Sequence, residues 1–290
     1  MKSKKILDFE NNGVCIAIDG QFLYTGSKGA ISKYHSNDMS LTAHTIINNP
    51  KKKNIYDGLY FKILHDYIFV SDFCDLHVLQ KSDLQLLYTV RLGNDASSGV
   101  CGVLDFKFPK AYIKIRNGKI DILDIKTKKA ARIEISDSST WSNCITENRI
   151  YYSTTKGELF ELERFTMREI RKVQLTKKMN IYSVVPYNNM LYTTSEKGFK
   201  IVDINTFEIV RNEPDVFYST EAKIIGICRK AFVVVERKKV ALFDTQTLQL
   251  IERFDFPTGY RHQRYAVLSG DILYGSDEHG IYCSALDTKK

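Results

Sequence analysis

The sequence predicts an all-β fold, a seven-bladed β-propeller with four antiparallel strands in each blade, and three observations indicate this fold. One segment, in which an apolar strand leads through a polar turn to an alternating strand, recurs seven times along the 290 residues. Apolar and polar residues alternate with a period of two, whereas helical repeats place apolar residues three and four positions apart. The repeat length lies in the low forties, which is typical of a propeller blade with about four short strands.

Each copy contains two strands that the pattern locates directly. In chain order, these strand–turn–strand segments cover residues 22–34, 67–79, 112–123, 150–162, 191–202, 232–243 and 272–284. A polar turn follows each of the first six segments, and its marker residues lie 39 to 45 positions apart: Asp38, Asp83, Thr127, Thr166, Thr206 and Thr247. A strand before each segment and a strand after its turn complete the predicted blade.

The two ends of the chain are predicted to share one blade. The seventh copy, about residues 260–288, stops where its outermost strand is expected to begin. Residues 5–9 precede the first copy and are similar to the sixth outer strand at 250–256. We therefore expect residues 5–9 to pair with the last copy and close the ring, because an unpaired strand edge invites aggregation. Residues 1–290 then form a single propeller domain.

Two segments carry a resemblance to known propellers. They are Val202-Asp-Ile-Asn-Thr-Phe-Glu208 and Phe243-Asp-Thr-Gln-Thr-Leu-Gln249, in which Asp and Thr mark the turn between two strands. The pattern resembles the broad superfamily of WD-repeat and quinoprotein-like propellers along the whole chain. The Gly-His and Trp-Asp dipeptides of WD repeats are absent, and the chain has one Trp. The resemblance is one of architecture, and it implies the seven-bladed fold.

The motifs of enzymes and metal sites are missing from the sequence. Cys74 and His77 have metal-ligand spacing, but no second pair accompanies them and structural zinc needs four ligands. The recurring carboxylates Asp124, Asp203, Asp244 and Asp287 follow strands, where capping of a turn explains them. The sequence therefore predicts a non-catalytic protein without metal or cofactor. A third interpretation, a small-ligand binder or enzyme that uses the central channel, has no residues to support it.

The start of the chain is charged, and no apolar run approaches the roughly 20 residues of a membrane-spanning helix. The six cysteines show no paired spacing, so they are interpreted as reduced thiols. We expect a cytoplasmic or nuclear protein that does not insert into a membrane.

Positive charge is concentrated in one part of the chain. Residues 101–200 hold 19 basic and 11 acidic residues, which accounts for the net charge of +8 of the whole chain. The basic sector at 107–178 is predicted to lie on neighbouring blades, and its candidate polyanion-binding residues are Lys126, Lys128, Lys129, Arg164 and Arg168. One hypothesis is a nucleic-acid or ribonucleoprotein-associated propeller that contacts phosphates there. A solvated, Lys-rich set of outer strands explains the same charge, and the sequence slightly favours it.

Two long loops supply the candidate surface for a protein partner. The loops at 212–219 and 257–264 both join an outer strand to the next inner strand, so both are predicted to lie on one face. Aromatic residues and Arg are enriched at interface hot spots. The candidates are Phe217, Tyr218, Tyr260, Arg261 and Arg264. The leading hypothesis is a protein-interaction scaffold, monomeric on its own, that binds through this face; the alternative is that the aromatic rings pack beneath their loops.

Overall fold

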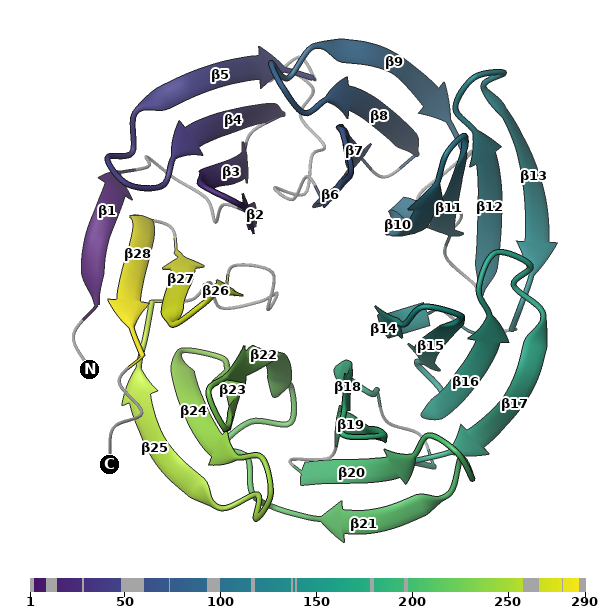
Figure 1. Cartoon of the computed structure of the whole chain (residues 1–290), viewed down its shortest axis with the longest axis vertical. Coiled ribbons are helices and arrows are strands. Elements are labelled where there is room, and N and C mark those ends of the chain that lie inside the picture. The colour runs from purple at the N-terminus through teal and green to yellow at the C-terminus, as the bar shows by residue number, and fades with distance from the viewer. Residues whose placement is uncertain are drawn as a thin grey trace. The chain divides into compact units, whose positions relative to one another are not determined.

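The computed structural model describes residues 3–8, 15–27, 29–47, 60–72, 74–92, 100–115, 118–136, 138, 140–177, 180–195, 198–257, 266–277 and 279–286. They form seven four-stranded antiparallel sheets, the blades of a β-propeller (Figure 1). The predicted all-β fold of seven blades is therefore confirmed. The described part of the chain has no helix long and apolar enough to cross a membrane.

The first three blades follow one another along the chain. The first blade consists of β2 (Cys15–Asp19), β3 (Phe22–Ser27), β4 (Ala30–His35) and β5 (Leu41–Ile46). The second consists of β6 (Tyr60–Leu64), β7 (Tyr67–Asp72), β8 (Asp75–Gln80) and β9 (Leu86–Arg91). The third consists of β10 (Val100–Lys107), β11 (Lys110–Ile115), β12 (Lys119–Asp124) and β13 (Lys129–Glu134).

The next three blades repeat this order. The fourth consists of β14 (Thr140–Ile145), β15 (Arg149–Thr154), β16 (Glu158–Glu163) and β17 (Glu169–Gln174). The fifth consists of β18 (Ser183–Tyr187), β19 (Met190–Ser195), β20 (Gly198–Asp203) and β21 (Ile209–Glu213). The sixth consists of β22 (Lys223–Cys228), β23 (Ala231–Glu236), β24 (Lys239–Asp244) and β25 (Leu250–Asp255).

The last blade joins the two ends of the chain. It contains β26 (Ala266–Ser269), β27 (Ile272–Ser276), β28 (Gly280–Ala285) and, as its outer strand, β1 (Lys4–Asp8). β1 pairs antiparallel with β28, with Lys4 opposite Cys283 and Asp8 opposite Gly280. A Cβ atom at Gly280 would lie 2.3 Å from the carbonyl oxygen of Leu7, so the close approach of these strands requires Gly. The predicted pairing of the N-terminal strand with the last blade is confirmed.

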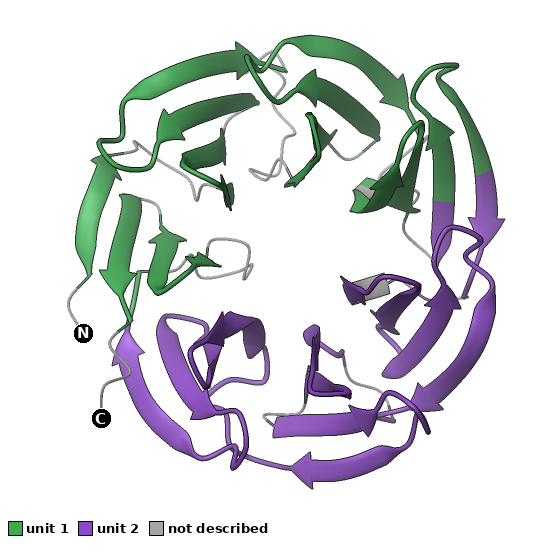
Figure 2. Cartoon of the chain, viewed as in Figure 1, with its two compact units in different colours: residues 1–115, 121–131, 256–290 green, residues 116–120, 132–255 purple. Residues whose placement is uncertain are grey.

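The chain divides into two compact units (Figure 2). The first unit comprises residues Met1–Ile115, Asp121–Ala131 and Phe256–Lys290, and the second comprises Arg116–Ile120 and Arg132–Asp255. The first unit therefore holds the first, second and last blades and most of the third, and the second unit holds the fourth to sixth. That residues 1–290 act as one domain stays a prediction.

The core lies between the faces of successive sheets. Every residue of β23, the second strand of its blade, is buried, whereas outer strands such as β5 consist of exposed and half-buried residues. In the second unit, Phe199 of β20 and Phe243 of β24 are buried, with ring centroids 5.3 Å apart in an edge-to-face contact. Such aromatic pairs add to the free energy gained by burying apolar area.

A single type of turn joins the third and fourth strands of the first six blades. In each copy the fourth turn residue has a φ near +60° and its N–H donates to the carbonyl oxygen four residues earlier: Met39, Leu84, Lys128, Met167, Phe207 and Leu248. The side chains of Leu84, Met167, Phe207 and Leu248 are buried. This turn lets a large apolar side chain fold back and fill the end of its blade, and Lys128 of the third blade is the exception.

Candidate functional site

The loop between β21 and β22 is held in place by an aromatic anchor. Phe217 is buried, and its ring centroid lies 4.6 Å from that of Phe199 and 5.5 Å from that of Phe243. The far end of the loop is fixed by Thr194, whose Oγ1 donates to the carbonyl oxygen of Ala222 at 2.6 Å. Both ends of the loop are therefore fixed to the sheets of the second unit.

A buried ion pair fixes the middle of the same loop. The carboxylate of Glu236, at the end of β23, has no exposed surface, and it accepts a hydrogen bond from Arg253 Nε on β25 at 2.8 Å. Its other oxygen accepts from the backbone N–H of Tyr218 at 2.9 Å, and Arg253 Nη2 donates to the carbonyl oxygen of Val216 at 3.1 Å. A buried carboxylate is stable only when it is paired and hydrogen-bonded, and here the loop backbone completes the set of partners.

Tyr218 is the large aromatic side chain that this loop exposes to solvent. It is 63% exposed, although its two neighbours Phe217 and Ser219 are buried. The ammonium group of Lys239 lies over its ring, 5.5 Å from the centroid, and also pairs with Asp255 at 3.3 Å. A cation over the ring orients the aromatic group without covering it. The arrangement fixes a large amphipathic side chain in an exposed position.

The residues that the sequence analysis placed together on this face differ in their exposure to solvent. Phe217 was predicted on an exposed loop, but it is buried in the core because the ring fills the space between Phe199 and Phe243. Tyr218 is exposed as predicted. Tyr260, Arg261 and Arg264 lie outside the described residues.

The candidate polyanion-binding residues belong to both units. Lys126, Lys128 and Lys129 are exposed in the first unit, where Lys126 Nζ lies 5.0 Å from the ring centroid of Phe108. Sequence reasoning missed Phe108, because a single Phe before Pro in a hairpin has no signature. It is 54% exposed, so the basic residues do have an aromatic ring beside them.

The two arginines of this set lie in the second unit and are engaged locally. Arg164 donates to the carbonyl oxygens of Thr146 and Glu147, both at 3.2 Å. Arg168 pairs with Glu163 of its own blade, with 3.6 Å between Nε and Oε2. Both guanidinium groups therefore already bind protein oxygen atoms.

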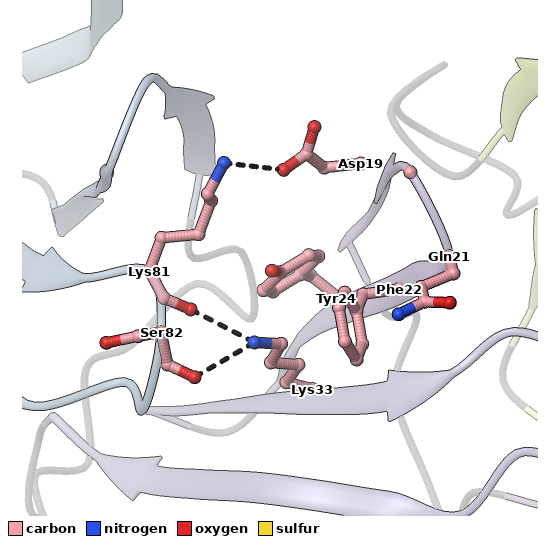
Figure 3. Close-up of a pocket in the computed structure, with 8 residues that line it drawn as sticks. Asp19, Gln21, Phe22, Tyr24, Lys33, Lys81 and Ser82 are labelled. Carbon is pink, nitrogen blue, oxygen red and sulfur yellow. Dashed lines mark hydrogen bonds and ion pairs between the residues drawn. The ribbon is translucent and has the colours of Figure 1, made fainter.

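A cavity of about 290 Å³ lies between the first and second blades, within the first unit (Figure 3). Its main polar group is Lys33 of β4, which is 7% exposed and whose Nζ donates to the carbonyl oxygens of Lys81 and Ser82 at 3.3 and 2.9 Å. The same ammonium lies 4.1 Å from the ring centroid of Phe22. Desolvation lowers the pKa of Lys33, and the charge of Lys81 lowers it further.

Two arginines of the second unit make the same kind of contact as Lys33. We call this contact a clasp: a cationic side chain of one blade donates to carbonyl oxygens in a turn of the next blade. Arg171 of β17 donates to the carbonyl oxygens of Ile204 and Asn205 in the third turn of the next blade. Arg211 of β21 donates to those of Gln246 and Thr247 in the equivalent turn of the blade after, at 3.2 and 2.9 Å. Lys33 is therefore best explained as a cationic clasp that, like Arg171 and Arg211, ties a blade to the turn of its neighbour.

The thiols that the structure describes are not arranged as metal ligands. Among the residues that the structure describes, no three His, Cys, Asp or Glu side chains gather as a metal site. Five described cysteines are free thiols, and burial raises the pKa of Cys144 to about 12. A thiol with that pKa is protonated at neutral pH and is a poor nucleophile.

The comparisons with known proteins identify the fold alone. No protein-family model matches the sequence, and no curated protein sequence matches it. The WD40 domain of Pan2 from Neurospora crassa superposes with a TM-score of 0.74 over 99% of this chain and 96% of that domain, at 12% identity. The fold is that of a WD40-like β-propeller. The computationally designed Ika8 protein matches with a TM-score of 0.68 over 97% of this chain and 99% of its own, at 11% identity.

Proposed function

We propose that this propeller is a non-catalytic scaffold that binds a protein partner through the Tyr218 surface, which consists of Tyr218 and the adjoining Lys239. The observation that carries the proposal is an exposed tyrosine whose backbone is held by a carboxylate with no exposed surface. Binding by a mobile loop loses free energy because the loop must be ordered, and a loop that is already fixed avoids that loss. Tyrosine is among the side chains that contribute most to binding at interfaces.

The chemistry of the described residues supports a reducing setting for this interaction. Five free thiols, two of them buried, are typical of proteins from the cytoplasm or the nucleus. WD40-like propellers present rigid loops on a stable frame, and binding residues occur preferentially on such loops.

Site-specific photocrosslinking tests the proposal. A photoreactive phenylalanine derivative placed at position 218 should give one predominant crosslinked protein in native lysate, and the band should survive nuclease treatment. The same group at Ile209, which is 41% exposed on β21 of the same unit, is the matched control. Crosslinking that is equal at both positions, or absent at 218, would contradict a partner-binding role for the Tyr218 surface.

A further inference from the structure

The third blade differs from the others at both turns on one side of its sheet. Its first turn, between β10 and β11, places Phe108 and Pro109 between the paired residues Lys107 and Lys110. Its third turn, between β12 and β13, has Lys126, Lys128 and Lys129 where the corresponding turn of the sixth blade has Gln246, Leu248 and Gln249. The N–H of Ile125 donates to the carbonyl oxygen of Pro109 at 2.8 Å, so the two turns lie against each other.

Lys128 stands where the other copies use an apolar side chain. Its φ is +60°, as at Leu84, Phe207 and Leu248, but its side chain is exposed. The ammonium group lies 5.1 Å from the ring centroid of Tyr88 on the outer strand of the second blade. The third blade thus lacks the apolar side chain that fills the end of its neighbours. A position where a sequence departs from the rule that stabilises its other repeats is a candidate for selection by function.

Phe108 adds an exposed aromatic ring to these cations. It is 54% exposed, and its ring is in an edge-to-face arrangement with that of the buried Phe106, with 6.4 Å between the ring centroids. Lys126 Nζ lies 5.0 Å from the centroid of Phe108. All five lysines of the two turns are exposed: Lys107, Lys110, Lys126, Lys128 and Lys129.

The two turns contain one acidic residue, Asp124, which offsets only part of this positive charge. Asp124 accepts hydrogen bonds from the backbone N–H groups of Lys126 and Thr127, both at 2.9 Å, and these bonds lower its pKa. Residues 107–110 and 124–130 together contain five lysines and one carboxylate. The two turns therefore form a surface with net positive charge around an exposed ring.

We propose that Phe108 and the lysines of these two turns form a binding site for single-stranded nucleic acid. Lysines supply contacts to phosphates, and release of counterions from the strand favours binding. The ring supplies a surface on which an unpaired base can stack. A duplex has no such base to offer, because its bases are already paired and stacked on one another. An exposed ring among the lysines therefore favours single strands over duplexes and acidic peptides. The site lies in the first unit and is independent of the Tyr218 surface.

Fluorescence anisotropy with labelled oligouridylate of roughly 20 nucleotides tests this site. Phe108→Ala should weaken binding about 5- to 150-fold, since stacking of one base contributes about 1–3 kcal/mol. Phe108→Tyr keeps a ring and should bind within about twofold of the parent protein. Tyr218→Ala removes an exposed aromatic residue of the second unit and should leave the affinity for the oligonucleotide unchanged.

The lysines are tested by the salt dependence of the same measurement. Replacement of Lys126, Lys128 and Lys129 by Gln should reduce the slope of log Kd against log salt by about 2, because each lost contact to a single strand accounts for about 0.7. Circular dichroism melting of every variant separates lost binding from lost folding. Equal affinity of the Phe108→Ala and parent proteins would overturn the proposal, and so would equal affinity of the parent for oligouridylate, a duplex of the same length and polyglutamate.

Discussion

Glu236 is the residue on which the position of Tyr218 depends. Its carboxylate is fully buried and binds both Arg253 and the Tyr218 backbone N–H. Glu236→Gln should lower the free energy of unfolding by about 3 kcal/mol, because Arg253 loses a buried counter-charge. Urea unfolding followed by circular dichroism measures the change. Glu208→Gln, an exposed position on the preceding turn, is the control, and equal stability of the two variants would show that the buried pair does not hold the loop.

In the first unit, Lys33 has a structural role because it links two blades. Its buried ammonium donates to two carbonyl oxygens of the next blade. Lys33→Met keeps the length of the side chain but leaves these acceptors without their donor, so we expect a loss of about 1–3 kcal/mol in the free energy of unfolding. Lys177→Met changes an exposed lysine and should stay within about 0.5 kcal/mol of the parent protein. If Lys33→Met leaves the urea midpoint unchanged, the clasp does not stabilise the blades.

At the scale of the element, the turn between β12 and β13 allows a test of whether Lys128 lowers the stability of the fold while it contributes to binding. Lys128→Met supplies the apolar side chain that Met39 and Met167 provide in their own turns. We expect the free energy of unfolding to rise by about 1 kcal/mol through apolar burial, although the contact with Tyr88 is lost. The urea midpoint measures the gain, and anisotropy should show weaker binding of oligouridylate. A less stable variant would contradict the account of this turn.

The strands were predictable from sequence because each copy repeats the same alternation. The segments at 67–79 and 232–243 became β7–β8 and β23–β24, and the turn after each fell where Asp83 and Thr247 indicated. Side-chain direction in irregular segments was not predictable in the same way. Phe217 and Tyr218 are adjacent and chemically similar, and only packing against Phe199 decides which of them is buried.

Contacts between blades could not be predicted from the sequence either. Lys33 and Ser82 are 49 positions apart, and no periodicity in the sequence predicts that the Lys33 ammonium binds the carbonyl oxygen of Ser82. The proximity of Phe108 to Lys126 depends in the same way on two turns that meet only in the folded sheet. The repeat therefore predicts the elements, whereas the candidate sites depend on the contacts between them.

At the scale of the whole molecule, the repeated turns predict a dependence of stability on acid. Backbone N–H groups bind the carboxylates of Asp38, Asp124 and Asp244 and lower their pKa values below the ordinary value of 3.8. Because the folded-state pKa is the lower one, this stabilisation is complete above the unfolded-state value and is lost as the pH falls through the folded-state values. Urea unfolding between about pH 5 and pH 2 should show this loss. Asp244→Asn should be less sensitive to pH in that range, and unchanged sensitivity would contradict the assignment.

The most direct test of the scaffold is a quantitative pull-down with three proteins from one lysate. The parent protein, Tyr218→Ala and Phe108→Ala each carry the same tag, and bound proteins are measured by mass spectrometry after nuclease treatment. We predict one stoichiometric partner on the parent and on Phe108→Ala, and its loss on Tyr218→Ala with the melting temperature unchanged. A partner retained at equal abundance by Tyr218→Ala would contradict the claim that this propeller binds through the Tyr218 surface.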